Sequence, residues 1–239
     1  MAELTLKSVV KQYGRKASPA ISDLNLEAGD GEIDALLGPT SSGKTTLLRL
    51  IAGLESCSQG EIKIGSKVVN GVRPKDRRIG FAFSGYALYP ALNVRENLAL
   101  NLTARRASQK EIEKRIAETA ERFGIATLLD RKPAVLSAAE KLRVNVARAI
   151  IRRPSLLLVD EPLDRLDGMI HVLVRTDIKR LLLETGLTTV VATRSREDAM
   201  ALADRVAVLS SGNIQQYAAP TEIFYRPANE FVAKLVAEE

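Results

Sequence analysis

Residues 38–46 read Gly-Pro-Thr-Ser-Ser-Gly-Lys-Thr-Thr and directly follow the short apolar run 35–37. From Gly38 to Thr45 this segment fits the phosphate-loop pattern, in which a glycine, four variable residues and a second glycine precede a lysine and a hydroxyl residue. Such a loop turns a strand sharply into a helix while its backbone N–H groups point inward around a phosphate chain. Because the mostly apolar segment 47–52 can form that helix, the sequence predicts a unit that binds a nucleoside triphosphate.

Two side chains of the loop have separate expected roles. The Lys44 ammonium can reach the terminal phosphates as a point charge, and the Thr45 hydroxyl can complete the coordination shell of Mg²⁺. The alternative is an ordinary Gly/Ser-rich turn that ends in a lysine, and the flanking strand and helix patterns argue against it. The predicted nucleotide contacts are Gly38, Pro39, Thr40, Ser41, Ser42, Gly43, Lys44, Thr45 and Thr46.

The composition is that of an ordinary globular protein, with 46% hydrophobic and 27% charged residues among 239. This length allows one large domain or two small ones, and no apolar run approaches the roughly 18 residues needed to cross a bilayer. The net charge of +6 suits a nucleotide, an anionic membrane surface or a nucleic acid. Five Phe, five Tyr and no Trp leave few side chains for stacking bases, so nucleic-acid binding is not expected.

Strand patterns dominate the first 85 residues, and helical patterns rich in Ala, Glu, Lys and Arg dominate from about 93 to 151. After residue 155 strands and helices alternate, which predicts an α/β fold with a mainly parallel sheet covered by helices. The helical block lies between the phosphate loop and the next core strand, as an inserted subdomain would. The expected strands are 4–10, 24–27, 32–37, 61–64, 79–83, 156–159, 188–192 and 206–209, and the expected later helices are 168–185 and 196–203.

A second motif is the apolar run 156–159, which ends in Asp160 and Glu161. At the carboxyl end of a parallel strand, the Asp160 carboxylate can hold Mg²⁺ through water, as the equivalent aspartate does in phosphate-loop NTPases. Glu161 can orient and polarise an attacking water as a general base. An apolar run before two acids is weak evidence alone, because many buried strands end in acidic turns. Together with the phosphate loop it predicts a site for ATP and Mg²⁺, with Thr45 and Asp160 as the metal-binding pair.

Further segments match a single protein family, namely 11–14, 86–90, 166–167 and 199–205. With the two motifs above, they resemble the nucleotide-binding subunit of ABC transporters over nearly the whole chain. The likeness is greatest to subunits that drive carbohydrate importers of the maltose and glycerol-phosphate type. The resemblance implies an ABC ATPase fold and a head-to-tail dimer with ATP held at two shared sites. It also implies that Tyr13 stacks on adenine and that Asp167, at the end of the D-loop, contributes to nucleotide binding.

The resemblance also implies the organisation and the partners of the chain. We expect one nucleotide-binding domain over 1–239, with a RecA-like core at about 1–85 and 152–239, an antiparallel β part and an inserted helical subdomain at about 86–151. The C-terminal regulatory domain of such importer subunits would be absent, because the sequence stops at Glu239. The implied partners are transmembrane permease subunits, a second ATP-binding subunit and, indirectly, a solute-binding protein, at the cytoplasmic face of the inner membrane.

Three motifs depart from the family pattern. The glutamine that contacts Mg²⁺ and the attacking water falls on Ser84, which is shorter and has no amide. The switch histidine falls on Arg194, whose longer fork does not reproduce the histidine's geometry. The LSGGQ signature falls on 136–140, where Ser137 remains to meet the partner's ATP and both glycines become alanines. Glu140 there adds a negative charge beside an anionic ligand.

Smaller departures occur at Ser41, a loop position often occupied by glycine, and at Asp164, where the D-loop usually begins with serine. The only histidine, His171, is expected to be an ordinary surface or packing residue. The predicted catalytic residues are therefore Glu161 and the two degenerate positions Arg194 and Ser84.

The departures favour retained ATP binding with much reduced turnover, because losing one preorganised donor typically costs about 10²–10³ in rate. We therefore expect the ATP-binding subunit of a carbohydrate or polyol importer that pairs with a second, more competent ATP-binding subunit. Three alternatives remain open. The first is a fully active homodimeric ATPase with functional substitutes at 84 and 194. The second is a non-transport ABC protein, and the third is a regulatory subunit that uses ATP only as a dimerisation ligand.

Overall fold

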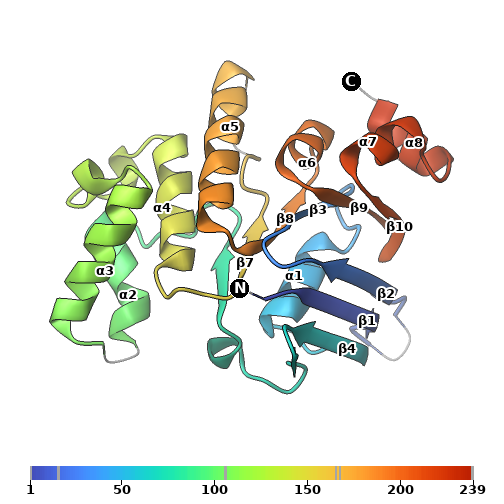
Figure 1. The fold of residues 1–239 in the computed structure, drawn as a ribbon, viewed down its shortest axis with the longest axis horizontal. Coiled ribbons are helices and arrows are strands. Elements are labelled where there is room, and N and C mark those ends of the chain that lie inside the picture. The colour runs from blue at the N-terminus through green and yellow to red at the C-terminus, as the bar shows by residue number, and fades with distance from the viewer. Residues whose placement is uncertain (1, 15–16, 105–106, 165, 167, 238–239) are drawn as a thin grey trace.

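The computed structural model describes residues 2–14, 17–104, 107–164, 166 and 168–237, and two sheets form its framework (Figure 1). The larger sheet has six strands in the order β10-β9-β3-β8-β7-β6, and the smaller has four in the order β2-β1-β4-β5. The larger sheet comprises β3 (Ile33–Leu37), β6 (Ile79–Ala82), β7 (Leu156–Asp160), β8 (Thr188–Thr193), β9 (Arg205–Ser210) and β10 (Asn213–Ala218). The smaller sheet comprises β1 (Leu4–Lys11), β2 (Ile21–Ala28), β4 (Gln59–Ile64) and β5 (Lys67–Val68).

Five neighbouring strands of the larger sheet run parallel, and β10 pairs antiparallel with β9 at one edge. Every residue of β3, β7 and β8 is buried, as expected for parallel strands covered on both faces. Parallel strands end at the same edge of a sheet. The residues at the carboxyl ends of these strands, among them Gly38, Asp160 and Arg194, therefore gather at one edge.

Helix α1 (Lys44–Ala52) lies between the two sheets. Its Leu47 and Leu50 belong to one buried cluster with Leu6 of β1 and Leu158 of β7. At its carboxyl end the buried Arg77 guanidinium donates hydrogen bonds to the carbonyl oxygens of Leu50 and Ile51, at 2.9 and 2.8 Å. Packing on both sides and this cap fix the direction in which the amino end of α1 points.

Helices α2 (Val94–Thr103), α3 (Gln109–Arg122) and α4 (Ala138–Ile150) come between β6 and β7 in the chain and form a block at one side of the molecule (Figure 1). Their inner side chains, such as Leu98, Ile116 and Leu142, join a second buried cluster that continues under the sheet at Val159. Helix α5 (Gly168–Thr185) stands between that block and α6 (Arg196–Leu202). Short 3₁₀ turns occupy Pro74–Asp76, Ala126–Leu128 and Pro133–Val135.

The α/β class, the mainly parallel core sheet, the antiparallel β part and the inserted helices are confirmed. The sequence analysis missed β5, β10, α7 (Pro220–Tyr225) and α8 (Glu230–Ala237). Four of the six residues of β10 are half-buried, so this strand has no alternation of apolar and polar positions to reveal it. None of the helices in the described part of the chain is long and apolar enough to cross a membrane.

Candidate nucleotide site

The loop between β3 and α1 depends on both of its glycines. A Cβ atom on Gly38 would lie 2.3 Å from the carbonyl oxygen of Leu209, and one on Gly43 would lie 2.9 Å from that of Ala20. Gly43 also has a φ of 107°, in the region that side chains disfavour. The loop backbone therefore lies too close to its neighbours for any larger residue at these two positions.

The amino end of α1 has the character of an anion-binding site. Gly43 caps the helix without a side-chain hydrogen bond, and no acidic residue lies in the first turn, so this helix end carries no charge of its own to neutralise the free N–H groups. Beside it, the Ser42 hydroxyl is buried and has no hydrogen-bond partner among the described residues. A phosphate group supplies the acceptors that both features need.

Lys44 is buried at the start of α1, and its ammonium donates to the carbonyl oxygens of Gly38 at 2.6 Å and Pro39 at 3.0 Å. Its Nζ lies 3.7 Å from Oε1 of Glu161. Burial lowers the pKa of Lys44, and the neighbouring Glu161 carboxylate opposes that shift. The lysine is thus held folded over its own loop by contacts that a terminal phosphate can replace.

Thr45 and Asp160 meet across the gap between α1 and β7. The Thr45 hydroxyl lies 3.3 and 3.4 Å from the two carboxylate oxygens of Asp160. Burial raises the pKa of Asp160, and the Thr45 hydroxyl opposes that shift. A hydroxyl and a buried carboxylate at the mouth of a phosphate loop are oxygen donors of the kind that Mg²⁺ takes, so these residues fit the ion that the sequence predicts.

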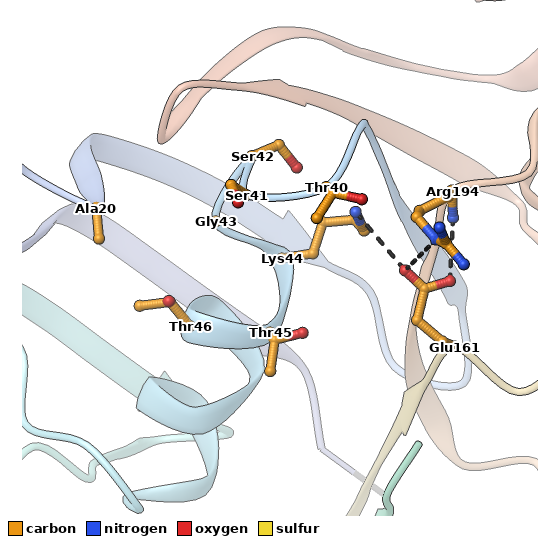
Figure 2. A pocket seen from close by; sticks show the side chains of 10 residues that line it. All are labelled: Ala20, Thr40, Ser41, Ser42, Gly43, Lys44, Thr45, Thr46, Glu161 and Arg194. Atoms are coloured by element: carbon orange, nitrogen blue, oxygen red, sulfur yellow. Dashed lines mark hydrogen bonds and ion pairs between the residues drawn. The ribbon is translucent and has the colours of Figure 1, made fainter. Parts of the chain in front are cut away.

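Glu161 lies between two cations (Figure 2). It has a left-handed backbone with φ 45°, and its N–H donates to the Ala192 carbonyl of β8 at 2.9 Å. Its Oε2 accepts from the Arg194 backbone N–H at 3.2 Å, and its Oε1 lies 3.7 Å from Arg194 Nε as well as from Lys44. Burial raises the pKa of Glu161, while Lys44 and Arg194 hold it down.

Lys44, Thr45, Glu161 and Arg194 line a cavity of about 470 Å³ at the carboxyl edge of the parallel sheet (Figure 2). Its lining unites two segments that lie far apart in the sequence, the phosphate loop and the pair Glu161 and Arg194. The lining residues are Ala20, Thr40, Ser41, Ser42, Gly43, Lys44, Thr45, Thr46, Glu161 and Arg194. Ala20, an unreactive residue before β2, was missed by sequence reasoning because nothing in its chemistry marks it.

Other predicted site residues lie outside this lining. Tyr13 is 57% exposed, and Lys11 lies over its ring at 4.7 Å. Ser84 is exposed in the turn after β6, and Ser137 is exposed at the amino end of α4. Asp167 falls outside the described residues. The roles of these four residues remain predictions.

Ser41 has the left-handed conformation expected of a glycine position, with φ 65°. A residue with a Cβ pays roughly 1–2 kcal/mol for this conformation, so the substitution strains the loop slightly without changing its path. Ser41 therefore adopts the backbone conformation that a glycine would adopt at this position.

In the signature segment, 136–140, two residues hydrogen-bond to each other. The Ser137 N–H donates to Oε2 of Glu140 at 2.7 Å, and the Glu140 N–H donates to the Ser137 hydroxyl at 3.2 Å, which is a complete capping box at the start of α4. The Ser137 backbone N–H holds the pKa of Glu140 below its ordinary value. The amino end of α4 thus carries its own carboxylate, in contrast to the open end of α1.

His171 is half-buried on α5, with Nε2 3.2 Å from Oδ2 of Asp198. Asp198 is buried on α6 and also lies 3.6 Å from Arg175. These contacts tie α5 to α6. His171 therefore packs against a neighbouring helix, and it lines a second cavity of about 310 Å³ that also borders Glu161 and Arg194.

The fold and the phosphate loop define a P-loop nucleoside triphosphatase. The family model described as ABC transporter matches residues 21–164, which is more than half of the chain. The chain therefore belongs to the ABC transporter family, whose members couple ATP hydrolysis to transport.

Two relatives illustrate the likeness in sequence. The chain is 47% identical over 236 residues to the sn-glycerol-3-phosphate import ATP-binding protein UgpC of Rhizobium meliloti (strain 1021), covering 99% of this chain and 67% of that protein. It is 43% identical over 242 residues to the trehalose/maltose import ATP-binding protein MalK of Thermococcus litoralis, covering 99% of this chain and 64% of that protein. The resemblance to carbohydrate-importer subunits is confirmed.

The structure is also similar to a dimeric bacterial ABC transporter cassette, with a TM-score of 0.78 and 30% identity. A dimeric post-hydrolysis state of an ATP-binding cassette bound to ADP and Pi gives a TM-score of 0.77 and 30% identity. Each comparison covers 91% of this chain and 98% of the other. The ABC ATPase fold expected from the sequence is thereby confirmed.

Proposed function

We propose that the chain is the ATP-binding subunit of an ABC importer for a carbohydrate or polyol and that it binds Mg-ATP in the phosphate-loop cavity. The observation that carries the proposal is the convergence of the uncapped α1 end, buried Lys44 and Thr45 at one cavity, with Asp160 in contact with the Thr45 hydroxyl. Both relatives are import ATP-binding proteins, for sn-glycerol-3-phosphate and for trehalose and maltose, which supports the transport role and the substrate class.

The residues at the cavity have separate roles in ATP binding and hydrolysis. Bound Mg²⁺, held by Thr45 and Asp160, supplies charge neutralisation on the phosphates. The N–H groups of the loop and α1 orient the phosphate chain, and Lys44 binds its terminal part. Glu161, ionised, accepts the proton of a water that attacks the γ-phosphorus, and the bridging oxygen leaves with ADP. Burial favours this step because it makes the Glu161 carboxylate a stronger base.

We propose further that hydrolysis by this chain alone is weak. In a head-to-tail dimer, the signature of one subunit faces the γ-phosphate held by the other. Here the capping box places the Glu140 carboxylate at that helix end, where it repels an approaching phosphate. The exposed Ser84, which lacks an amide, does not line the cavity and offers no replacement for the family's glutamine.

These features favour pairing with a second ATP-binding subunit that has an intact signature. In such a heterodimer the phosphate loop, Asp160 and Glu161 of this chain face the partner's intact segment, and that composite site retains slow turnover. We propose permease subunits as the membrane partners, a solute-binding protein as an indirect partner, and a peripheral position at the cytoplasmic face of the inner membrane.

The decisive experiment measures Mg-ATP binding and steady-state ATP hydrolysis side by side on the purified chain. We expect Mg-ATP binding that is lost in Lys44→Ala, together with turnover near background. Addition of the matched second subunit should raise turnover, and Glu161→Gln should abolish the gain while Mg-ATP binding persists. Fast turnover by the chain alone would instead support a fully active homodimer, and absence of Mg-ATP binding would overturn the proposal as a whole.

A further inference from the structure

Asp164 and Arg194 both depart from the family pattern, and the structure brings them together. Although 30 residues separate them in sequence, the Arg194 guanidinium forms an ion pair with Oδ1 of Asp164. Asp164 lies after β7 and Arg194 directly follows β8, two adjacent strands of the parallel sheet. A cation in place of a histidine is thus matched by an anion in place of a serine, and each charge has its partner within the chain.

The same arginine also holds Glu161, through its backbone N–H at 3.2 Å and through Nε at 3.7 Å. Lys44 approaches the Glu161 carboxylate at the same distance, 3.7 Å. Glu161 is therefore engaged by two cations, and its side chain is only 17% exposed. These contacts engage both carboxylate oxygens, Oε1 with the two side-chain cations and Oε2 with the Arg194 N–H.

Arg194 has room to leave this arrangement. Its side chain is 49% exposed and lines both the phosphate-loop cavity and the adjoining cavity of about 310 Å³. A guanidinium binds phosphate oxygens, as it binds carboxylates, through two parallel hydrogen bonds. The terminal phosphate of ATP therefore competes directly with Asp164 and Glu161 for this group, whereas ADP lacks that phosphate.

We propose that Asp164 is a positioning residue that holds Arg194 against Glu161, and that the γ-phosphate of ATP takes Arg194 from both carboxylates. The Glu161 carboxylate is then free to face the attacking water. Asp164 and Arg194 thus form a latch that makes release of the general base depend on the third phosphate. This inference rests on the proposed function, because it requires a triphosphate in the cavity.

Calorimetric titration with Mg-AMP-PNP and with Mg-ADP tests the latch. Asp164→Asn removes the charge that competes with the γ-phosphate. It should raise the affinity for Mg-AMP-PNP about three- to fivefold, as expected for loss of a half-exposed ion pair, and change that for Mg-ADP less than twofold. Asp164→Ser, which restores the family's residue type, is a second variant for the case that Asp164→Asn folds poorly. It should raise the affinity for Mg-AMP-PNP and leave that for Mg-ADP little changed, in the same way. In an Arg194→Ala background neither change should have an effect.

Glu113→Gln is the matched control, because Glu113 forms a similarly exposed ion pair with Arg95 on the helical block, at 2.7 Å. It should leave both affinities unchanged. An unchanged or reduced ratio of Mg-AMP-PNP to Mg-ADP affinity in both Asp164 variants would overturn the latch while leaving ATP binding intact. If the unaltered chain binds neither nucleotide in a Lys44-dependent manner, the proposed function itself is wrong.

Discussion

Replacement of Asp34 by asparagine should stabilise the protein above neutral pH. Asp34 is the second residue of β3 and is fully buried among core strands. Its Oδ2 accepts a hydrogen bond from the Tyr217 hydroxyl at 2.5 Å, and its Oδ1 has no hydrogen-bond partner among the described residues. Burial raises the pKa of Asp34 from 3.8 to about 7, although the Tyr217 hydrogen bond opposes the shift.

The sign of the pH dependence is set by this raised pKa. The unfolded chain loses the Asp34 proton near pH 4, whereas the native state keeps it until about pH 7. The contribution of Asp34 to the unfolding free energy is therefore fully present below about pH 4, and it is lost progressively as the pH rises to about 7. The difference between the two pKa values corresponds to about 4 kcal/mol of unfolding free energy.

Asparagine has the same shape and no charge, so Asp34→Asn removes this loss at high pH. With its oxygen accepting from the Tyr217 hydroxyl, its NH₂ group is buried at the Oδ1 position without a partner, which costs about 1 kcal/mol. We expect the variant to gain about 3 kcal/mol of unfolding free energy at pH 8 and to be within about 1 kcal/mol of the unaltered chain at pH 5.

Urea unfolding at pH 5 and pH 8 measures this difference directly. Asp30→Asn, at an exposed turn position before β3, is the matched control for the change in net charge and should show no such pH dependence. An equal change in unfolding free energy at both pH values would mean that the pKa of Asp34 is the same in the native and the unfolded state. That result would refute the reasoning from burial.

Three further predictions concern the nucleotide site. Lys44→Ala should weaken Mg-ATP binding by at least about 100-fold in calorimetry, because it removes the buried cation that faces the phosphates. Asp160→Asn should raise the Mg²⁺ concentration needed for half-maximal ATP binding at least about tenfold, with Mg²⁺-free binding little changed. Glu140→Ala should lower the free energy of unfolding by about 1 kcal/mol, whereas Glu140→Gln, which preserves a capping box, should cost less than half of that in urea titrations.

The sequence predicted the phosphate loop because its chemistry is contiguous. Two glycines, a lysine and a threonine at fixed spacing describe the strand–loop–helix turn without reference to any distant residue. The strand 156–159 was predictable for a similar reason, since a fully buried parallel strand is a continuous apolar run. β10 was missed because a half-buried edge strand carries no such pattern.

The sequence did not predict contacts that depend on how adjacent strands place their carboxyl ends. The pairing of Asp164 with Arg194, and of Glu161 with both Arg194 and Lys44, arises because β7 and β8 lie side by side while α1 begins opposite them. The sequence marks each of these four residues separately, as part of a motif or as a departure from the family pattern. Their interaction energy depends on distances of a few ångströms, which local spacing does not encode.

The charges at three of the positions expected to depart from the family pattern have partners within the chain. Glu140 in the signature segment caps its own helix, and Asp164 neutralises Arg194, so each new charge is satisfied within the chain. The phosphate loop, in contrast, retains the uncapped helix end that an anion needs. The contrast between the two helix ends therefore fits the proposal of retained ATP binding with weak hydrolysis.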